Sequence, residues 1–167
     1  MSQVPCTFAA MEVKVIRSPR RRKTVQARQV GEVLQVSIPS WMSVADEERH
    51  VAEMVRRMQR RAESAEVDLG ARAASLAVAH GFPRPASIRW VDNQEWRWGS
   101  CTPADGTIRI SSRLAREPAW VLDYVIVHEL AHLSQPGHGE AFWELANRYP
   151  RTERARGFLI ARGLEPV

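Results

Sequence analysis

The chain has 167 residues, is 44% hydrophobic and carries a net charge of +5, with a pI near 10.0. This length can bury one proper core, so a single domain over residues 1–167 is expected. The sequence has no apolar run of about eighteen residues and no signal-peptide pattern at its start, which excludes a membrane-spanning protein and favours the cytoplasm.

The two cysteines, Cys6 and Cys101, are far apart in sequence and provide no disulfide framework, which favours a reducing compartment. We expect Cys101 to be a buried structural thiol, because one cysteine without a second at short spacing is a weak signal for a metal site. The basic charge has two explanations of equal weight, an anionic partner or a general preference for arginine over lysine. Binding of nucleic acid is therefore left open.

Alternating apolar and polar residues predict antiparallel strands within residues 12–38. A basic run, Arg17–Lys23, separates the first two of these strands. A charged hairpin end explains this run best, and contact with phosphates is the less favoured alternative.

Two helices are predicted within residues 43–80. Ser43 is the expected N-cap of the first, with Asp46 three residues later as its capping-box partner. An apolar stripe along this helix indicates core packing, and the arginines near its end suit the helix dipole. His50 and His80 lie in these helices without a second ligand at metal-binding spacing, so we expect neither to bind a metal.

A β-hairpin is predicted within residues 87–111, where two alternating segments flank a turn. Trp96 and Trp98 are two residues apart, so in a strand they would project to one face, and at least one is expected in the core. Gly99 indicates that another element or a substrate chain approaches the backbone closely at this point.

The strongest chemical signal is His-Glu-x-x-His, formed by His128, Glu129 and His132 on a helix predicted over residues 118–133. The two histidines are one turn apart, so both imidazoles can reach one metal ion, with Glu129 beside it. A Pro-Gly turn then allows His138 to swing back as the third ligand. Three protein ligands with an open position for water are typical of a catalytic zinc, although two packed core histidines are the alternative.

Two further helices are predicted after this motif. One covers residues 139–148 and packs Phe142 and Trp143, and a short closing helix lies within residues 151–167.

Ordered motifs cover most of the chain: Arg17–Thr24, Arg97–Thr102, Ile108–Ile110, Arg113–Leu114, Asp123–Leu133, and His138 followed by Phe142–Trp143. This series resembles the YgjP-like metallopeptidase domain family. The resemblance implies a zincin-like α+β single domain, in which a small, mostly antiparallel sheet packs beside the metal-binding helix. It also implies a zinc-dependent hydrolase with one Zn²⁺ per chain and with His138 as the third ligand. One departure is Ser111 or Ser112, which stands where we expect an asparagine in this family.

The leading hypothesis is a zinc metallopeptidase that acts on a peptide or protein substrate. Zinc would lower the pKa of a bound water, and Glu129 would take its proton and pass it to the leaving amine. By analogy with zincins, the strand around Trp98–Thr102 would present its edge to an extended peptide.

Several supporting roles stay open at the level of sequence. The group that stabilises the oxyanion has three candidates, Tyr124, Tyr149 and Arg97. Asp123 or Glu140 could orient a ligand histidine, although each is equally explained as a solvated helix charge.

Two other functions compete with this hypothesis. Similar spacing occurs in the WLM and SprT-like proteases that act on DNA–protein crosslinks, and the basic charge suits a DNA-bound substrate. A zinc-stabilised binding module without catalysis is the other alternative. Glu129 and only three evident ligands argue against that module, since structural zinc sites usually have four protein ligands.

Overall fold

The computed structural model describes residues 12–163, which belong to two compact units, one ending at Gln59 and the other beginning at Arg60. Helices and two three-stranded sheets confirm the α+β class. None of the described helices has the length and apolarity needed to span a bilayer. The single domain over residues 1–167 stays a prediction.

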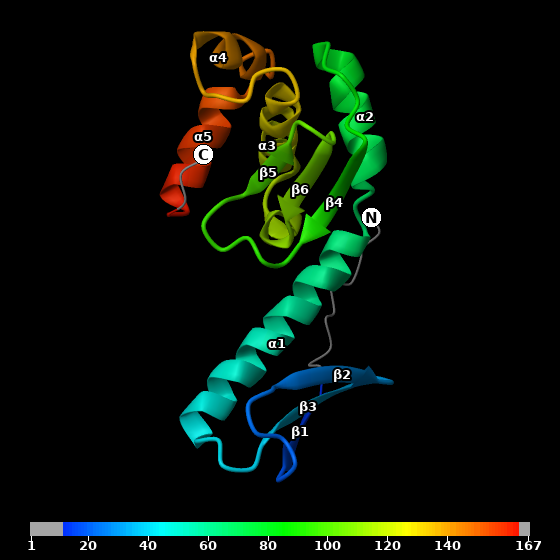
Figure 1. Cartoon of the computed structure of the whole chain (residues 1–167), viewed down its shortest axis with the longest axis vertical. Coiled ribbons are helices and arrows are strands. Elements are labelled where there is room, and N and C mark those ends of the chain that lie inside the picture. Colours follow the sequence, from blue (N-terminus) through cyan, green and yellow to red (C-terminus); the bar gives the residue numbers. More distant parts are fainter. Residues whose placement is uncertain (1–11, 164–167) are drawn as a thin grey trace, which may run out of the picture. The chain divides into compact units, whose positions relative to one another are not determined.

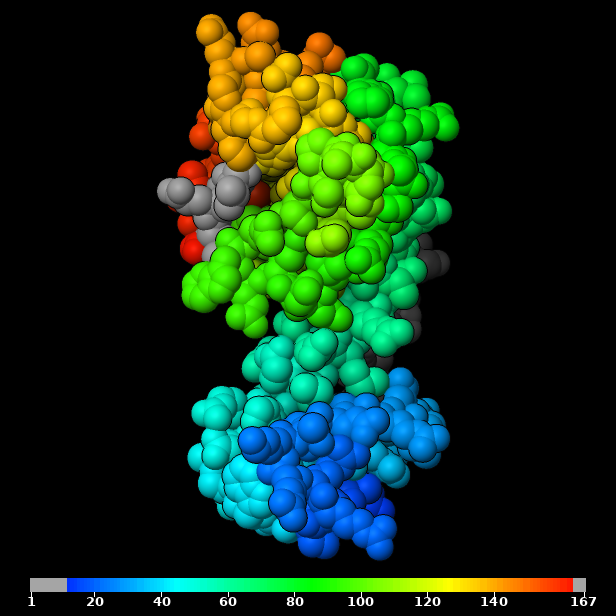
Figure 2. Space-filling model, in the orientation of Figure 1, coloured from blue at the N-terminus to red at the C-terminus, as the bar shows by residue number. Residues whose placement is uncertain are grey.

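The first unit is a small sheet with one helix. Its elements are β1 (Glu12–Ser18), β2 (Gln26–Val30), β3 (Val33–Pro39) and the larger part of α1 (Val44–Ala65), as Figure 1 shows. In Figure 2 the residues of this unit are coloured from blue, for the strands, to cyan, for α1. The strand order is β1-β3-β2.

The sheet of this unit is mixed and not fully antiparallel. β2 runs antiparallel to β3 as predicted, whereas β1 runs parallel to β3. The prediction of a hairpin between the first two strands is therefore wrong. Ser18 pairs with Pro39 and Gln26 pairs with Ser37, so the basic run crosses the end of β3 to join two edge strands.

The core of the first unit is the inner face of β3. Leu34, Val36 and Ile38 alternate along the strand and are each fully buried. The predicted apolar stripe of α1, represented by Met54 and Met58, packs against them. Burial of each side chain of this size contributes roughly 1.5–3 kcal/mol to the stability of the folded state.

The predicted N-cap of the first helix forms, and the second helix ends in a glycine cap. Ser43 Oγ accepts a hydrogen bond from the Asp46 N–H at 3.1 Å and donates to the Asp46 carboxylate at 2.8 Å. The second helix ends at Gly81, whose φ of 71° is the left-handed conformation that glycine adopts without a steric penalty.

The second unit contains the remaining elements: α2 (Leu69–His80), β4 (Ser87–Val91), β5 (Gly99–Thr102), β6 (Thr107–Ser111), η1 (Ser112–Arg116), α3 (Ala119–His132), α4 (Glu140–Ala146) and α5 (Thr152–Ala161). Its sheet has the order β4-β6-β5. The predicted hairpin is confirmed for β5 and β6, but β4 pairs with β6 in parallel. Both sheets are thus mixed where a mostly antiparallel one was expected, because each central strand also receives a parallel neighbour from earlier in the chain.

Helix α3 lies at the centre of this unit, between the sheet on one side and α2, α4 and α5 around it (Figure 1). From Val121 to Ala131 every residue except Asp123 is buried. A helix that is apolar around its whole circumference belongs in a core, and the packing on all sides holds its backbone in place. Asp123 accepts a hydrogen bond from Arg72 of α2 at 2.6 Å.

Substituting Ile126→Ala should lower the free energy of unfolding by about 2–5 kcal/mol, because Ile126 of α3 is fully buried and the change leaves a cavity. Urea unfolding followed by tryptophan fluorescence measures this loss. Ile160→Ala is the matched control, since Ile160 is 53% exposed on α5 and its truncation should stay within roughly 0.5 kcal/mol. Equal losses for the two variants would contradict the central position of α3.

Candidate active site

Three histidine side chains meet beside the end of α3. His128 and His132 extend from one face of this helix, and His138 comes from the segment between α3 and α4. Nε2 of His138 lies 3.0 Å from Nε2 of His132 and 3.2 Å from Nε2 of His128. The nitrogens of all three lie within 4.8 Å of one another. The structure thus brings together the three histidines that the sequence singled out.

The spacing of these nitrogens fits a tetrahedral metal ion. Two ligands at a Zn–N distance of about 2.0–2.1 Å are separated by roughly 3.3–3.4 Å along the edge of a tetrahedron. The two short Nε2 separations, 3.0 and 3.2 Å, are close to this value. Lone pairs that face one another at such distances repel unless a cation lies between them, so the donor set suits a divalent ion.

A hydrogen bond to a backbone carbonyl shows which nitrogen of His132 is available to the site. His132 Nδ1 lies 2.9 Å from the carbonyl oxygen of Gln135, which can only accept. Nδ1 therefore carries the proton and Nε2 presents a lone pair to the site. Burial lowers the pKa of His132, which also favours the neutral ring. The hydroxyl of Tyr124 lies 3.4 Å from Nδ1 of His128, and it is compatible with either tautomer because a hydroxyl can donate or accept.

The residues that orient the rings differ from the two carboxylates considered from sequence. Asp123 is paired with Arg72, and Glu140 is exposed at the start of α4. The carbonyl of Gln135 holds His132 instead. Sequence reasoning missed this contact, and its one signal was the Pro-Gly turn that bends the chain just after Gln135.

Phe142 of α4 forms a wall behind all three imidazoles. Its ring is buried and stacks on His132 with a centroid distance of 4.4 Å. It meets the rings of His128 and His138 edge to face at 4.8 and 4.6 Å. The predicted packing of Phe142 thus has a particular partner, the histidine-bearing face of α3, which the sequence pattern did not show.

Glu129 is 5% exposed and lies between α3 and the first strand of the hairpin, β5. A Cβ atom on Gly99 would lie 2.8 Å from Cγ and 2.9 Å from Cδ of Glu129, closer than real Cβ contacts come. The close approach predicted at Gly99 is therefore made by this side chain. Burial raises the pKa of Glu129 to about 8, while the guanidinium of Arg97 acts in the opposite direction.

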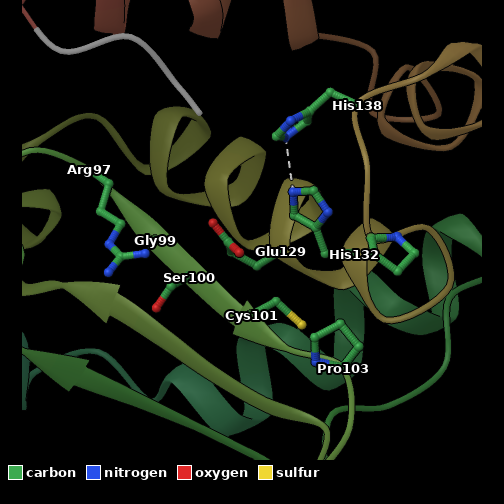
Figure 3. A pocket seen from close by; sticks show the side chains of 9 residues that line it. Arg97, Gly99, Ser100, Cys101, Pro103, Glu129, His132 and His138 are labelled. Carbon is green, nitrogen blue, oxygen red and sulfur yellow. Dashed lines mark hydrogen bonds between the residues drawn. The ribbon is translucent and has the colours of Figure 1, made fainter.

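A pocket of about 220 Å³ opens onto Glu129, His132 and His138. Its other wall is β5 with the residues beside it, as Figure 3 shows. β5 pairs with β6 along one edge, and no other described strand pairs with it. The pocket thus lies between an edge strand and the histidine-bearing helix. Its wall contains Arg97, Gly99, Ser100, Cys101, Pro103 and Pro136.

Cys101 was expected to be buried, but in this wall it is only half-buried. The pKa of its thiol is raised to about 11, mainly by desolvation and to a smaller extent by the negative charges of Glu129 and Asp105. The thiol therefore stays protonated at neutral pH. Cys6 lies outside the described residues.

The two tryptophans before β5 have opposite environments. Trp98 is 3% exposed, with the guanidinium of Arg113 over its ring at 4.2 Å, whereas Trp96 is 81% exposed. The prediction that at least one lies in the core is confirmed. They do not share a strand face, because β5 begins only at Gly99.

The three residues considered for stabilising the oxyanion differ in their access to the pocket. Tyr124 is fully buried behind His128, and the hydroxyl of Tyr149 donates to the carbonyl of Trp120 at 3.0 Å. Arg97 lines the pocket next to Glu129. Within residues 12–163, His50 and His80 take part in no group of three potential metal ligands.

Residues 20–160 match the YgjP-like family, which is described as a metallopeptidase domain. Among solved structures, the crystal structure of the metallopeptidase zymogen of Pyrococcus abyssi abylysin is similar, with a TM-score of 0.52 and 19% identity. The match covers 57% of this chain and 96% of that one, and at this identity it shows the fold alone. No curated protein matches the sequence. Because the family match extends over most of the chain, the chain belongs to the YgjP-like metallopeptidase domain family.

Proposed function

We propose that this chain is a zinc-dependent peptidase in which His128, His132 and His138 hold the metal and Glu129 is the general base. The observation that carries the proposal is the convergence of three Nε2 atoms next to a buried carboxylate at the wall of an open pocket. When bound, the metal supplies a Lewis acid that polarises the scissile carbonyl and acidifies a water molecule. Family membership supports the peptidase class.

The role of Glu129 follows from its surroundings. α3 lies behind the carboxylate and Gly99 beside it, so its open side faces the pocket. From this position it would take the proton of the attacking water and deliver it to the leaving amine. The absence of a side chain at residue 99 is what allows the carboxylate to reach this place.

The substrate would be a peptide or protein segment in an extended conformation. β5 offers a strand edge along the pocket, and backbone hydrogen bonds to such an edge bind peptides independently of their sequence. Arg97 is the cationic group of the pocket wall, which makes it the best of the three candidates for stabilising negative charge on the carbonyl oxygen. The buried position of Tyr124 and the bond of Tyr149 to Trp120 make the two tyrosines less suitable.

A zinc-stabilised module without catalysis has less support. Within the described residues no fourth potential ligand joins the three histidines, whereas a structural zinc site would be closed by a fourth protein ligand.

Glu129→Gln should abolish peptide hydrolysis while the metal stays bound, because the amide keeps the shape of the side chain but cannot accept the proton. We expect kcat to fall by at least about a hundredfold. Cleavage of a quenched fluorescent peptide library and elemental analysis of bound zinc measure the two quantities. Glu140→Gln, a change at an exposed position, should leave both unchanged. Hydrolysis by the Glu129→Gln variant at the parental rate would remove Glu129 from the role of base.

His138→Ala should lower zinc affinity strongly, because it removes one of three converging nitrogens. Equilibrium dialysis against a zinc buffer should give one zinc per chain for the parent and much less for the variant at the same free zinc concentration. His50→Ala serves as the control and should bind as the parent does. Parental affinity in the His138→Ala variant would show that residue 138 is not a ligand.

Gly99→Ala should reduce activity without loss of metal, because the new methyl group would displace the carboxylate of Glu129. A displacement of about 1 Å lowers kcat/KM by up to roughly a hundredfold. Gly137→Ala is the matched control in the same pocket region, since a Cβ there would meet nothing within 4 Å. If both variants cleave peptides equally well, the close approach at residue 99 has no role in catalysis.

A further inference from the structure

The first unit presents an exposed tryptophan that the active site does not use. Trp41, between β3 and α1, is 67% exposed. Its indole Nε1 donates a hydrogen bond to the carbonyl oxygen of Arg22 at 3.2 Å. The ring is thereby held against the basic segment 19–25 that joins β1 to β2. An exposed aromatic ring fixed in this way is a ready platform for another flat group.

The segments on both sides of this contact are tied together. The guanidinium of Arg17 donates to the carbonyl oxygens of Ser40 at 3.1 Å and Met42 at 2.9 Å, and it pairs with Glu47. Arg21 donates to the side chain of Gln26 at 2.6 Å. Because these bonds already hold the surface in shape, little conformational freedom would be lost on binding.

Three cations of the segment are available to a partner. Arg20, Arg22 and Lys23 are exposed, and no carboxylate within residues 12–163 forms an ion pair with them. We call Trp41 together with these three side chains the Trp41 surface. It combines an aromatic face with exposed positive charges.

Nearby charges leave the Trp41 surface positive. Of the acidic residues that begin α1, Glu47 pairs with Arg17 and Asp46 with Arg49, while Glu48 is exposed. The face of the sheet turned away from the core adds a row in which Lys14 and Arg28 flank Gln35. The described part of this unit has more cationic than acidic side chains, a balance that favours polyanions.

We propose that the Trp41 surface binds single-stranded nucleic acid, with an unpaired base stacked on the indole and phosphates against the three cations. Stacking platforms combined with backbone-tracking cations are the usual means of binding single strands. A duplex keeps its bases stacked on each other and would not use the ring, and an acidic peptide would use the cations alone. This activity goes beyond peptide hydrolysis and would bring the peptidase to proteins on single strands.

The test is fluorescence anisotropy of labelled oligonucleotides of twelve thymidines or twelve uridines, titrated with the full chain at several salt concentrations. Trp41→Ala should weaken binding about tenfold or more, and Trp41→Phe should retain most of it, because phenylalanine also stacks. The triple variant Arg20→Gln, Arg22→Gln and Lys23→Gln should weaken binding and flatten its salt dependence. The deoxyribose and ribose arms identify which nucleic acid is preferred.

Matched controls lie in the second unit. Trp96→Ala removes a tryptophan that is 81% exposed, and the triple variant Arg84→Gln, Arg89→Gln and Arg109→Gln removes three exposed cations. Both should bind as the parent does. Thermal unfolding monitored by circular dichroism establishes that each variant is folded.

The proposal is overturned if the parent does not bind either oligonucleotide at low salt, or if folded Trp41→Ala binds as tightly as the parent. Equal affinity for a duplex of the same length, or for polyglutamate, would likewise overturn it. Trp41→Ala should cleave short peptides as the parent does, and Glu129→Gln should bind oligonucleotides normally. A failure of nucleic-acid binding is thus distinguishable from a failure of the proposed peptidase activity.

Discussion

The packing of α3 on all sides is the constraint on which the candidate site depends. A helix whose residues are buried around its circumference cannot rotate or slide without breaking the core on every side. His128 and His132 therefore have fixed positions before any metal binds. α4 completes the arrangement, because Phe142 contacts all three imidazoles and the segment leading into α4 carries His138. The geometry of the site is a consequence of hydrophobic packing.

The second constraint is the contact between β5 and Glu129. A carboxylate buried to this degree carries a raised pKa, and it is accommodated here because the strand beside it lacks a side chain at Gly99. The same strand continues as the wall of the pocket through Ser100 and Cys101. One short edge strand thus supports the carboxylate and offers backbone groups to a substrate, which links the chemistry to peptide recognition in our proposal.

The first unit has a core of its own, formed by β3 and α1, and none of its described residues lines the pocket of the active site. The family match covers residues 20–160 and so includes most of this unit. A small sheet with a basic crossover and a held tryptophan is suited to binding. In our proposals the second unit cleaves peptides and the first unit binds single-stranded nucleic acid.

Local patterns in the sequence were sufficient for much of the structure. The cap at Ser43, the helix that carries His-Glu-x-x-His and the turn that returns His138 all depend on residues near one another in the chain. Periodicity and turn chemistry determine such features over short distances.

Tertiary structure alone decided the remaining features. Strand periodicity does not specify a partner, so the parallel pairing of β1 with β3 and of β4 with β6 could not be read from it. Trp96 and Trp98 have the same local signal, and only the core decides which is buried. The carbonyl of Gln135 and the ring of Phe142 reach the histidines through the fold of the chain after α3. In each case the arrangement is stabilised by contacts between segments that are distant in sequence. These contacts exist only once the chain is packed.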